Sequence, residues 1–375
     1  MLAHLLHLGG IDSVVLEDRS REHVEQRIRA GVLEQGTVDL LVEIGVGERM
    51  LREGLVHDGI EIQFAGRRQR IDFPSLTGGR RITVYGQQEV VKDLIAARVE
   101  TGRPLLFEVS DVRVDAFESE SPVLRFRHEG DEVELRCDFV AGCDGFHGVC
   151  RESIPAGVLT AFEREYPFAW LGILAEAPPS NEELIYAYHE RGFALHSMRS
   201  PTLTRLYLQC RPDEDIEEWP DERIWEELAR RFELGGWTLN TGEILEKGVT
   251  PMRSFVVEPM QCGRLFLAGD AAHIVPPTGA KGLNLAVADV RLLAAALAAW
   301  YRDADGSLLE RYSSDALRRV WRAEHFSWFM TSMLHRLEGG DDFDVKLQLA
   351  QLAYVCSSEK AAASLAENYV GLEHV

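Results

Sequence analysis

The spacing of apolar side chains predicts a helix and then a strand at the start of the chain. Residues 2–8 carry leucines at helical spacing, and a pair of glycines follows, which ends a helix. The next apolar run, residues 13–16, predicts a short buried strand that closes on the acidic Glu17. Helix, glycine, strand and acid in this order are typical of the second half of a dinucleotide-binding βαβ unit.

The middle of the chain changes from helical to alternating patterns. We expect polar helix over 20–58, short strands over 60–85 around a glycine turn, helix over 88–101, and an antiparallel meander over 105–142. The strand-rich segment 162–211 predicts a further antiparallel sheet.

The last third is predominantly helical. An acidic helix is expected over 212–232, a buried strand over 265–268 and an alanine- and leucine-rich helix over 283–300. Helical spacing then continues to about 366, with breaks near Asp305 and Gly339. The pattern therefore predicts a mixed α/β fold with an antiparallel sheet in its middle and a helical C-terminal region.

Charge and composition narrow the function classes. The formal net charge of -21 argues against nucleic acid and against an anionic membrane surface as partners. The sequence contains no stretch of about 18 apolar residues, so it does not predict a transmembrane helix. The six cysteines form no C-x-x-C pair or zinc-like cluster, so we expect no metal site and a reducing, cytoplasmic environment.

The strongest chemical signal is the segment 264–290. An apolar strand delivers Asp270 at its carboxyl end, where α/β folds bind ligands and where a carboxylate accepts hydrogen bonds from sugar hydroxyls. Gly279 and Gly282 let the backbone approach a flat ligand, and the helix that starts near Asn284 offers N–H groups to an electron-rich atom.

Several motifs over the whole chain resemble class A FAD-dependent aromatic hydroxylases of the 4-hydroxybenzoate type. The segment 264–290 resembles their second FAD motif, and CDGFHGVCR resembles their middle Asp-Gly motif. The further matching segments are RIRAGVLEQG, HSMRS, PMRSFVVEPM and AENYVGL. The resemblance implies a Rossmann-like FAD-binding domain over 1–160 completed by about 262–290, a substrate domain over 161–261, and a helical region over 275–375.

The resemblance also assigns roles around the substrate. Arg199, Ser197 and Tyr207 match residues that hold a substrate carboxylate, for which a guanidinium fork is suited. Tyr186 and Tyr369 match a tyrosine pair that deprotonates a phenol, whose ordinary pKa lies near 10. Without the family, Arg199 reads as a surface strand residue and Tyr186 as one more core aromatic.

Two further residues complete the implied chemistry at the substrate. His57 matches a surface histidine that passes the proton to solvent. Pro277 matches a proline whose carbonyl faces the substrate hydroxyl.

Cofactor contacts are implied in the same way. The matching FAD contacts are Glu17, Arg29, Gln87, Asp144, Asp270 and Asn284, and Arg205 matches an arginine linked to flavin movement. The matching pyridine-nucleotide contacts are Arg27, His147 and Arg253.

The implied reaction uses FAD, O2 and NADPH or NADH. The reduced flavin forms a C4a-hydroperoxide with O2, and the phenol of 4-hydroxybenzoate takes up a hydroxyl group to give 3,4-dihydroxybenzoate. The family also implies a homodimer.

The chain departs from the family pattern in two places. Counting back from Glu17 to the G-x-G-x-x-G turn passes Met1, so we expect the chain as written to lack that strand and turn and to retain FAD weakly. Asp18 and His23 stand where NADPH-preferring members place an arginine and a tyrosine, so we expect relaxed preference for NADPH. Two alternatives stay open: a class A flavoenzyme acting on another substrate, and a relic without activity.

Overall fold

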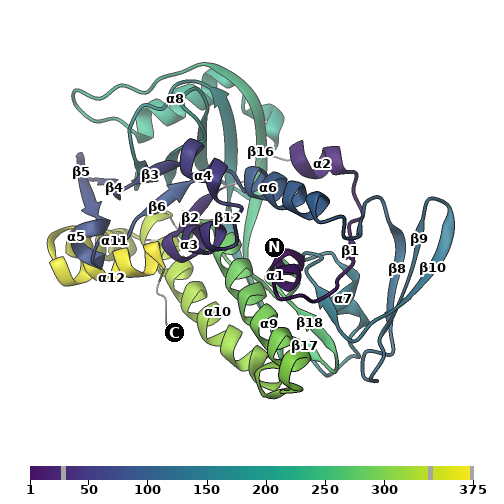
Figure 1. The fold of residues 1–375 in the computed structure, drawn as a ribbon. Helices are drawn as coiled ribbons and strands as arrows, with labels where there is room; N and C mark the ends of the chain where they lie inside the picture. Colours follow the sequence, from purple (N-terminus) through teal and green to yellow (C-terminus); the bar gives the residue numbers. More distant parts are fainter. Residues whose placement is uncertain (27–30, 337–340, 372–375) are drawn as a thin grey trace.

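The computed structural model describes residues 1–26, 31–336 and 341–371. An eight-stranded sheet dominates the middle of the molecule, with smaller sheets and helices from the N-terminal part beside it and long C-terminal helices below (Figure 1). This mixed α/β architecture confirms the fold class expected from the sequence.

The N-terminal part is built from short elements. The elements before residue 154 are α1 (Leu2–Leu8), β1 (Val15–Leu16), α2 (Arg21–Gln26), β2 (Val32–Glu34), α3 (Gln35–Glu43), α4 (Glu48–Glu53), β3 (Leu55–His57), β4 (Gly59–Phe64), β5 (Arg67–Asp72), α5 (Phe73–Thr77), β6 (Ile82–Val84), α6 (Gln87–Glu100), β7 (Leu105–Leu106), β8 (Ser110–Asp115), β9 (Val123–His128), β10 (Asp131–Arg136), β11 (Val140–Gly142) and α7 (Val149–Ser153).

The remainder carries the long elements. They are β12 (Thr160–Glu176), β13 (Leu184–Ala187), β14 (Ala194–Met198), β15 (Thr204–Cys210), the 3-10 turn η1 (Ile216–Glu218), α8 (Asp221–Arg231), β16 (Glu243–Glu258), β17 (Gln261–Cys262), β18 (Leu265–Leu267), η2 (Gly269–Ala271), β19 (His273–Ile274), η3 (Pro277–Gly279), α9 (Gly282–Asp303), α10 (Ser307–Leu334), α11 (Asp342–Ser357) and α12 (Glu359–Val370).

Several expectations for the N-terminal part need correction. The strand after α1 has only two residues, is half-buried rather than fully buried, and pairs in parallel with β7. The segment 20–58 is not only helical, because β2 and β3 pair with β6 in a three-stranded sheet. Their three-residue length gives too little alternation to show a strand period in the sequence. The meander over 105–142 is confirmed as β8, β9 and β10, and the expected break at Gly339 lies outside the described residues.

The large sheet runs in the order β19-β16-β12-β15-β14-β13-β4-β5. Strands β4 and β5 come from the first 72 residues, and β4 pairs in parallel with β13, so the sheet joins distant parts of the chain. One face of the sheet packs against α8 and the residue that follows it, which bury Ile224, Leu228 and Phe232 against strand residues such as Leu206 and Leu208. The buried part of β12 reads as a continuous apolar run because both of its faces are covered.

The opposite face of the sheet packs against the C-terminal helices. Its core contains aromatic residues of the strands together with side chains of α10, α11 and α12. Helices α9 and α10 run side by side below the sheet, in green in Figure 1. By length and composition α9 could cross a bilayer, yet more than half of it is buried inside the protein as a core helix.

Candidate active site

One row of residues crosses four strands of the large sheet and faces the C-terminal helices. Tyr186 on β13 pairs with Leu195 on β14, Leu195 pairs with Tyr207 on β15, and Tyr207 pairs with Gly172 on β12. Directly paired residues of antiparallel strands point to the same face. A Cβ at Gly172 would stand 2.9 Å from a guanidinium nitrogen of Arg205, so the glycine leaves room for that side chain.

Tyr186 meets Tyr369 at one end of this row. The two hydroxyl oxygens are 2.5 Å apart, although 183 positions separate the residues in sequence. Both rings are about 1% exposed, and Tyr369 stacks on Phe73 at 5.2 Å. Burial raises the pKa of both phenols, and for Tyr186 the proximity of Tyr369 raises it further. The pair is therefore neutral near pH 7 and is joined by a hydrogen bond.

Arg199 occupies the other end of the row. One terminal nitrogen donates to Ser197 Oγ at 2.9 Å and to the carbonyl of Met198 at 2.8 Å, and the other lies 3.4 Å from Tyr207 Oη. Its Nε is buried and has no hydrogen-bond partner among the described residues. Burial lowers the pKa of this guanidinium, and within the described chain no carboxylate forms an ion pair with it. A buried cation without a counterion is suited to a negatively charged ligand.

His57 is not at the surface, which corrects the expectation. It is the last residue of β3, which pairs with β6, and it occupies an inward-facing position of that strand. Its side chain is therefore only 2% exposed. Its Nδ1 has no partner among the described residues. Burial lowers the pKa of His57 to about 4, so the imidazole is neutral at pH 7.

The strand-to-helix segment expected to hold a flat ligand is open at Gly282 but not at Gly279, where a Cβ would stand 2.7 Å from Ser327 Oγ of α10. Asp270 lies in η2, shortly after β18, and is exposed, and Pro277 is exposed with its carbonyl accepting the Ala280 N–H at 3.0 Å. A carbonyl has a second lone pair, so it can accept another donor. Helix α9 begins at Gly282, where a Cβ would meet nothing within 4 Å. The open helix N-terminus and the exposed carboxylate fit FAD, with N–H donors for the flavin and an acceptor for its polyol chain.

Asn284 differs from the expected direct contact. Its side-chain oxygen accepts from Glu34 N at 2.9 Å and from Thr37 Oγ1 at 2.8 Å, and its nitrogen donates to two carbonyls, those of Val32 and Ala280. The amide is thus fully used inside the protein. It ties the start of α9 to β2 and α3, and so positions the loop.

A buried ionic group beside this loop was not singled out from the sequence. Lys281 Nζ donates to Glu34 Oε1 at 2.7 Å and to the carbonyl of Tyr369 at 2.9 Å, and Arg319 bonds the other oxygen of Glu34 at 2.6 Å. Burial lowers the pKa of Lys281, against the opposing effect of Glu34. The partners are 247 and 285 positions from Glu34, and no local pattern signals such pairs.

The remaining residues expected to contact FAD lie in separate places. Glu17 follows β1, is half-buried and accepts from Arg19 N at 3.0 Å. Gln87 is the first residue of α6, and Asp144 accepts the Cys150 N–H at 2.9 Å in front of α7. Arg205 Nη1 lies 3.3 Å from Glu246 Oε1, one strand from Ser197.

Two residues expected to contact the pyridine nucleotide share one aromatic ring. His147 lies 5.0 Å from the ring of Phe146, edge to face, and the guanidinium of Arg253 stands over the same ring at 4.8 Å. The structure therefore brings these two together, far from each other in sequence. The expected contacts Arg27 and Arg29 lie outside the described residues.

Comparisons with known proteins identify the family of this chain. A family model described as an FAD binding domain matches residues 1–327. The p-hydroxybenzoate hydroxylase of Acinetobacter baylyi is 49% identical over 375 residues, which cover 100% of this chain and 93% of that protein. The rifampicin monooxygenase of Streptomyces venezuelae is 27% identical over 326 residues, 84% of this chain and 65% of that one.

A solved structure extends the agreement to the whole fold. The p-nitrophenol 4-monooxygenase of Pseudomonas putida superposes with a TM-score of 0.85 at 19% identity, covering 100% of this chain and 95% of that chain. At this identity the likeness concerns the fold. Together with the family match and the full-length relative, these findings confirm the expected family and its cofactor FAD, so the chain belongs to the class A FAD-dependent aromatic hydroxylases.

Proposed function

We propose that this chain hydroxylates 4-hydroxybenzoate to 3,4-dihydroxybenzoate with FAD, O2 and NADPH or NADH. The observation that carries the proposal is the row from Arg199 and Tyr207 to Tyr186. It puts a cation without a counterion and a hydrogen-bonded tyrosine pair at the two ends of one aromatic-lined face. Tyr186 and Tyr207 are two strands apart, which is about 10 Å between backbones. A single benzene ring with polar groups at opposite ends suits that span.

At one end, Arg199 with Ser197 and Tyr207 holds the carboxylate. The unpartnered Nε and the second terminal nitrogen of Arg199 provide donors, and a carboxylate offers about four acceptor positions. The ligand would supply the missing counterion in a buried place, where a charged hydrogen bond is strongest.

At the other end, the tyrosine pair acts on the phenol. Tyr186 accepts the phenolic hydrogen bond while its own hydroxyl donates to Tyr369, which draws the proton away and raises the electron density of the ring. His57 is proposed as the exit of this relay. Because its pKa is lowered to about 4 by burial, it would hold the proton only in passing.

The FAD site is proposed over the loop from Asp270 to α9. Asp270, Glu17, Gln87, Asp144 and Arg29 would hold polar groups of the cofactor, while the N–H groups at Gly282 would face the flavin. Asn284 positions this loop, and the carbonyl of Pro277 would face the substrate hydroxyl. FAD, once reduced by the pyridine nucleotide, supplies an oxygen atom from O2 when it is bound.

Arg205 is proposed to respond to the flavin position. Its guanidinium stands 5.5 Å from the centre of the Tyr207 ring and pairs with the half-exposed Glu246, so it joins the substrate face to solvent. His147 and Arg253, which both contact Phe146, are proposed with Arg27 to bind the pyridine nucleotide. The exposed Asp18 disfavours a 2′-phosphate, which supports acceptance of NADH.

The assembly is proposed as a homodimer with three structural parts. We divide the chain into an FAD-binding part over 1–160 with about 262–290, a substrate part over 161–261, and a helical part over 275–375. Phe343, Leu347 and Tyr354 lie on one face of α11 and are 55–68% exposed, which supports a second copy as its cover. Six free cysteines support a reducing compartment, the cytoplasm.

One assay tests the function. The purified chain, supplemented with FAD, is given NADPH or NADH with and without 4-hydroxybenzoate, and the product is identified by mass spectrometry. We expect oxidation of the nucleotide that depends on the aromatic acid and yields 3,4-dihydroxybenzoate. Turnover of phenols that lack a carboxylate at equal efficiency would overturn the substrate assignment, and no turnover with bound FAD would support the relic.

A further inference from the structure

A cavity lies on the side of the large sheet where β15 meets α8. Its volume is about 310 Å³, at the lower end of pockets that hold small ligands, about 300–1,000 Å³. Its walls include two flat aromatic side chains, Phe168 and Trp219. None of the residues assigned above to substrate, FAD or pyridine nucleotide lines it.

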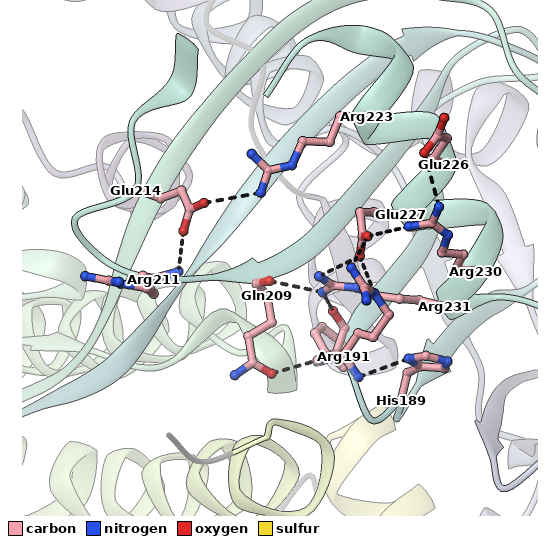
Figure 2. A network of polar contacts seen from close by, with 11 residues as sticks. His189, Arg191, Gln209, Arg211, Glu214, Arg223, Glu226, Glu227, Arg230 and Arg231 are labelled. Atoms are coloured by element: carbon pink, nitrogen blue, oxygen red, sulfur yellow. Dashed lines mark hydrogen bonds and ion pairs between the residues drawn. The ribbon is translucent and has the colours of Figure 1, made fainter. Parts of the chain in front are cut away.

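The cavity is positively charged in a strongly acidic protein. Its lining includes five arginines, at 191, 211, 223, 231 and 336, against three glutamates, at 190, 214 and 227. Figure 2 shows most of these side chains and their contacts. The formal net charge of the whole chain is -21, so the excess of cations in one hollow is a local feature and not a result of composition.

The excess is concentrated around one carboxylate. Glu227 accepts from Arg191 Nε at 3.0 Å, from Arg230 Nη1 at 3.2 Å and from Arg231 Nη2 at 3.3 Å, so three guanidinium groups contact this one buried carboxylate (Figure 2). Burial alone would raise the pKa of Glu227, but its arginine partners lower it. Glu227 is therefore ionised, and of its three partners Arg191 and Arg231 line the cavity, while Arg230 also pairs with Glu226 at 3.3 Å.

Two buried donors in the lining lack hydrogen-bond partners among the described residues. Arg231 is 4% exposed, and its Nε is unpartnered while its Nη1 donates to the carbonyls of Phe193 and Gln209 at 3.0 Å each. Trp219 is 3% exposed, and its Nε1 is also unpartnered. Buried donors are nearly always paired, so two of them at one cavity point to a ligand acceptor.

An aromatic ring layer separates this cavity from the row of the active site. Phe168, which lines the cavity, stacks on His335 at 4.6 Å, and His335 accepts the Trp170 Nε1–H at 2.6 Å. Trp170 contacts the ring of Tyr207 at 4.7 Å. The cavity and the catalytic face are thus neighbours that share a wall without sharing a site.

We propose that this cavity is a second binding site, for a small planar aromatic carboxylate. The carboxylate accepts from the Nε of Arg231 and the Nε1 of Trp219, and the ring contacts Trp219 and Phe168, which line the cavity. The substrate and the product of the reaction both have this chemistry. The site goes beyond the proposed function, because it needs none of the catalytic residues.

The test separates the two sites by variants of the FAD-loaded protein. Arg199→Met removes carboxylate binding at the catalytic face, and binding of 4-hydroxybenzoate is then measured by calorimetry. We expect two molecules per chain in the unchanged protein and one in Arg199→Met. Adding W219F and R223S to Arg199→Met removes one donor and one cation, and should weaken the remaining binding by about tenfold or more.

Matched controls keep the outcome clear. W225F and R125S, added to Arg199→Met in the same way, change a tryptophan and an arginine outside the cavity and should leave the remaining binding unchanged. No binding in Arg199→Met, or binding that W219F with R223S leaves unchanged, overturns the second site while the catalytic proposal stands. If inorganic phosphate at equal concentration displaces the bound 4-hydroxybenzoate, the assignment of the site to aromatic carboxylates is overturned. 3,4-Dihydroxybenzoate and 4-hydroxybenzoate as separate probes show whether product or substrate binds more tightly.

Discussion

Replacing Arg199 by methionine should separate ligand binding from stability. The guanidinium is buried, has an unpartnered Nε and pairs with no carboxylate in the described part of the chain. A substrate carboxylate would accept about two charged hydrogen bonds from it, each contributing about 1.5–3 kcal/mol. Allowing for the long 3.4 Å contact to Tyr207 and for residual apolar binding, we expect a loss of about 2–4 kcal/mol, roughly 30- to 1,000-fold in Kd.

The protein without substrate should respond in the opposite sense. Replacing a buried, uncompensated charge by an apolar side chain of similar length is often neutral or stabilising. The lost bonds to Ser197 and to the carbonyl of Met198 work against this, so we expect a Tm that is unchanged or slightly higher.

Two measurements on the FAD-loaded protein check this reasoning. Substrate affinity is read from the change in flavin absorbance on titration, and Tm is read by circular dichroism without substrate. Arg125→Met serves as the control, because Arg125 is a half-exposed strand arginine paired with Asp115 and Glu134, and it should change neither quantity by much. A fall in Tm by several degrees together with an affinity within threefold of the unchanged protein would refute the assignment of Arg199 as a substrate cation.

Four further variants probe the same geometry. Tyr186→Phe leaves Tyr369 Oη buried without its 2.5 Å partner and should lower kcat by a factor of about 10²–10⁴ at neutral pH with little change in KM. A phenolic substrate of lower pKa should recover part of this loss in kcat. Equal losses for both substrates would contradict the relay. Asn284→Ala removes four hydrogen bonds at the start of α9 and should lower the free energy of unfolding by about 2–4 kcal/mol, measured by denaturant titration. It should also weaken FAD binding, measured by flavin release. An unchanged FAD affinity would contradict the positioning role of Asn284. Burial raises the pKa of Glu324 from 4.5 to about 7, so this carboxyl increasingly destabilises the folded state as pH rises from about 4.5 through 7. Glu324→Gln should therefore be more stable than the unchanged protein by about 1–3 kcal/mol at pH 8 and differ little from it at pH 4. A difference in Tm that does not depend on pH would count against this reasoning. Asp18→Arg should raise the ratio of kcat/KM for NADPH over NADH by about tenfold, and an unchanged ratio would show that this exposed carboxylate lies away from the 2′-phosphate.

The element types could be predicted from the sequence for several long patterns, but the 16-residue strand β16 was not expected. Helices α6 and α9 have many turns and were placed within a few residues, and the strand-rich segments 105–142 and 162–211 correspond to β8–β10 and β12–β15. The three-residue strands β2 and β3 were missed because their partner β6 lies between 25 and 52 positions away, and a pairing at that distance leaves no local period.

The candidate site shows the same division. Motif resemblance alone named Tyr186, Tyr369, Ser197, Arg199 and Tyr207 as residues of one site. Only the register of β13, β14 and β15 and the docking of α12 placed them on one face.

What the sequence by itself determined is therefore the fold class, the family and the residue types available for chemistry, because these depend on local periodicity and on short motifs. The tertiary structure decided whether each side chain is exposed, paired or buried. It turned His57 inward, used the Asn284 amide internally, gathered Glu34, Lys281 and Arg319, and formed the arginine-lined cavity beside α8. Burial and pairing are properties of neighbours in space, and those neighbours lie up to 285 residues apart along the chain.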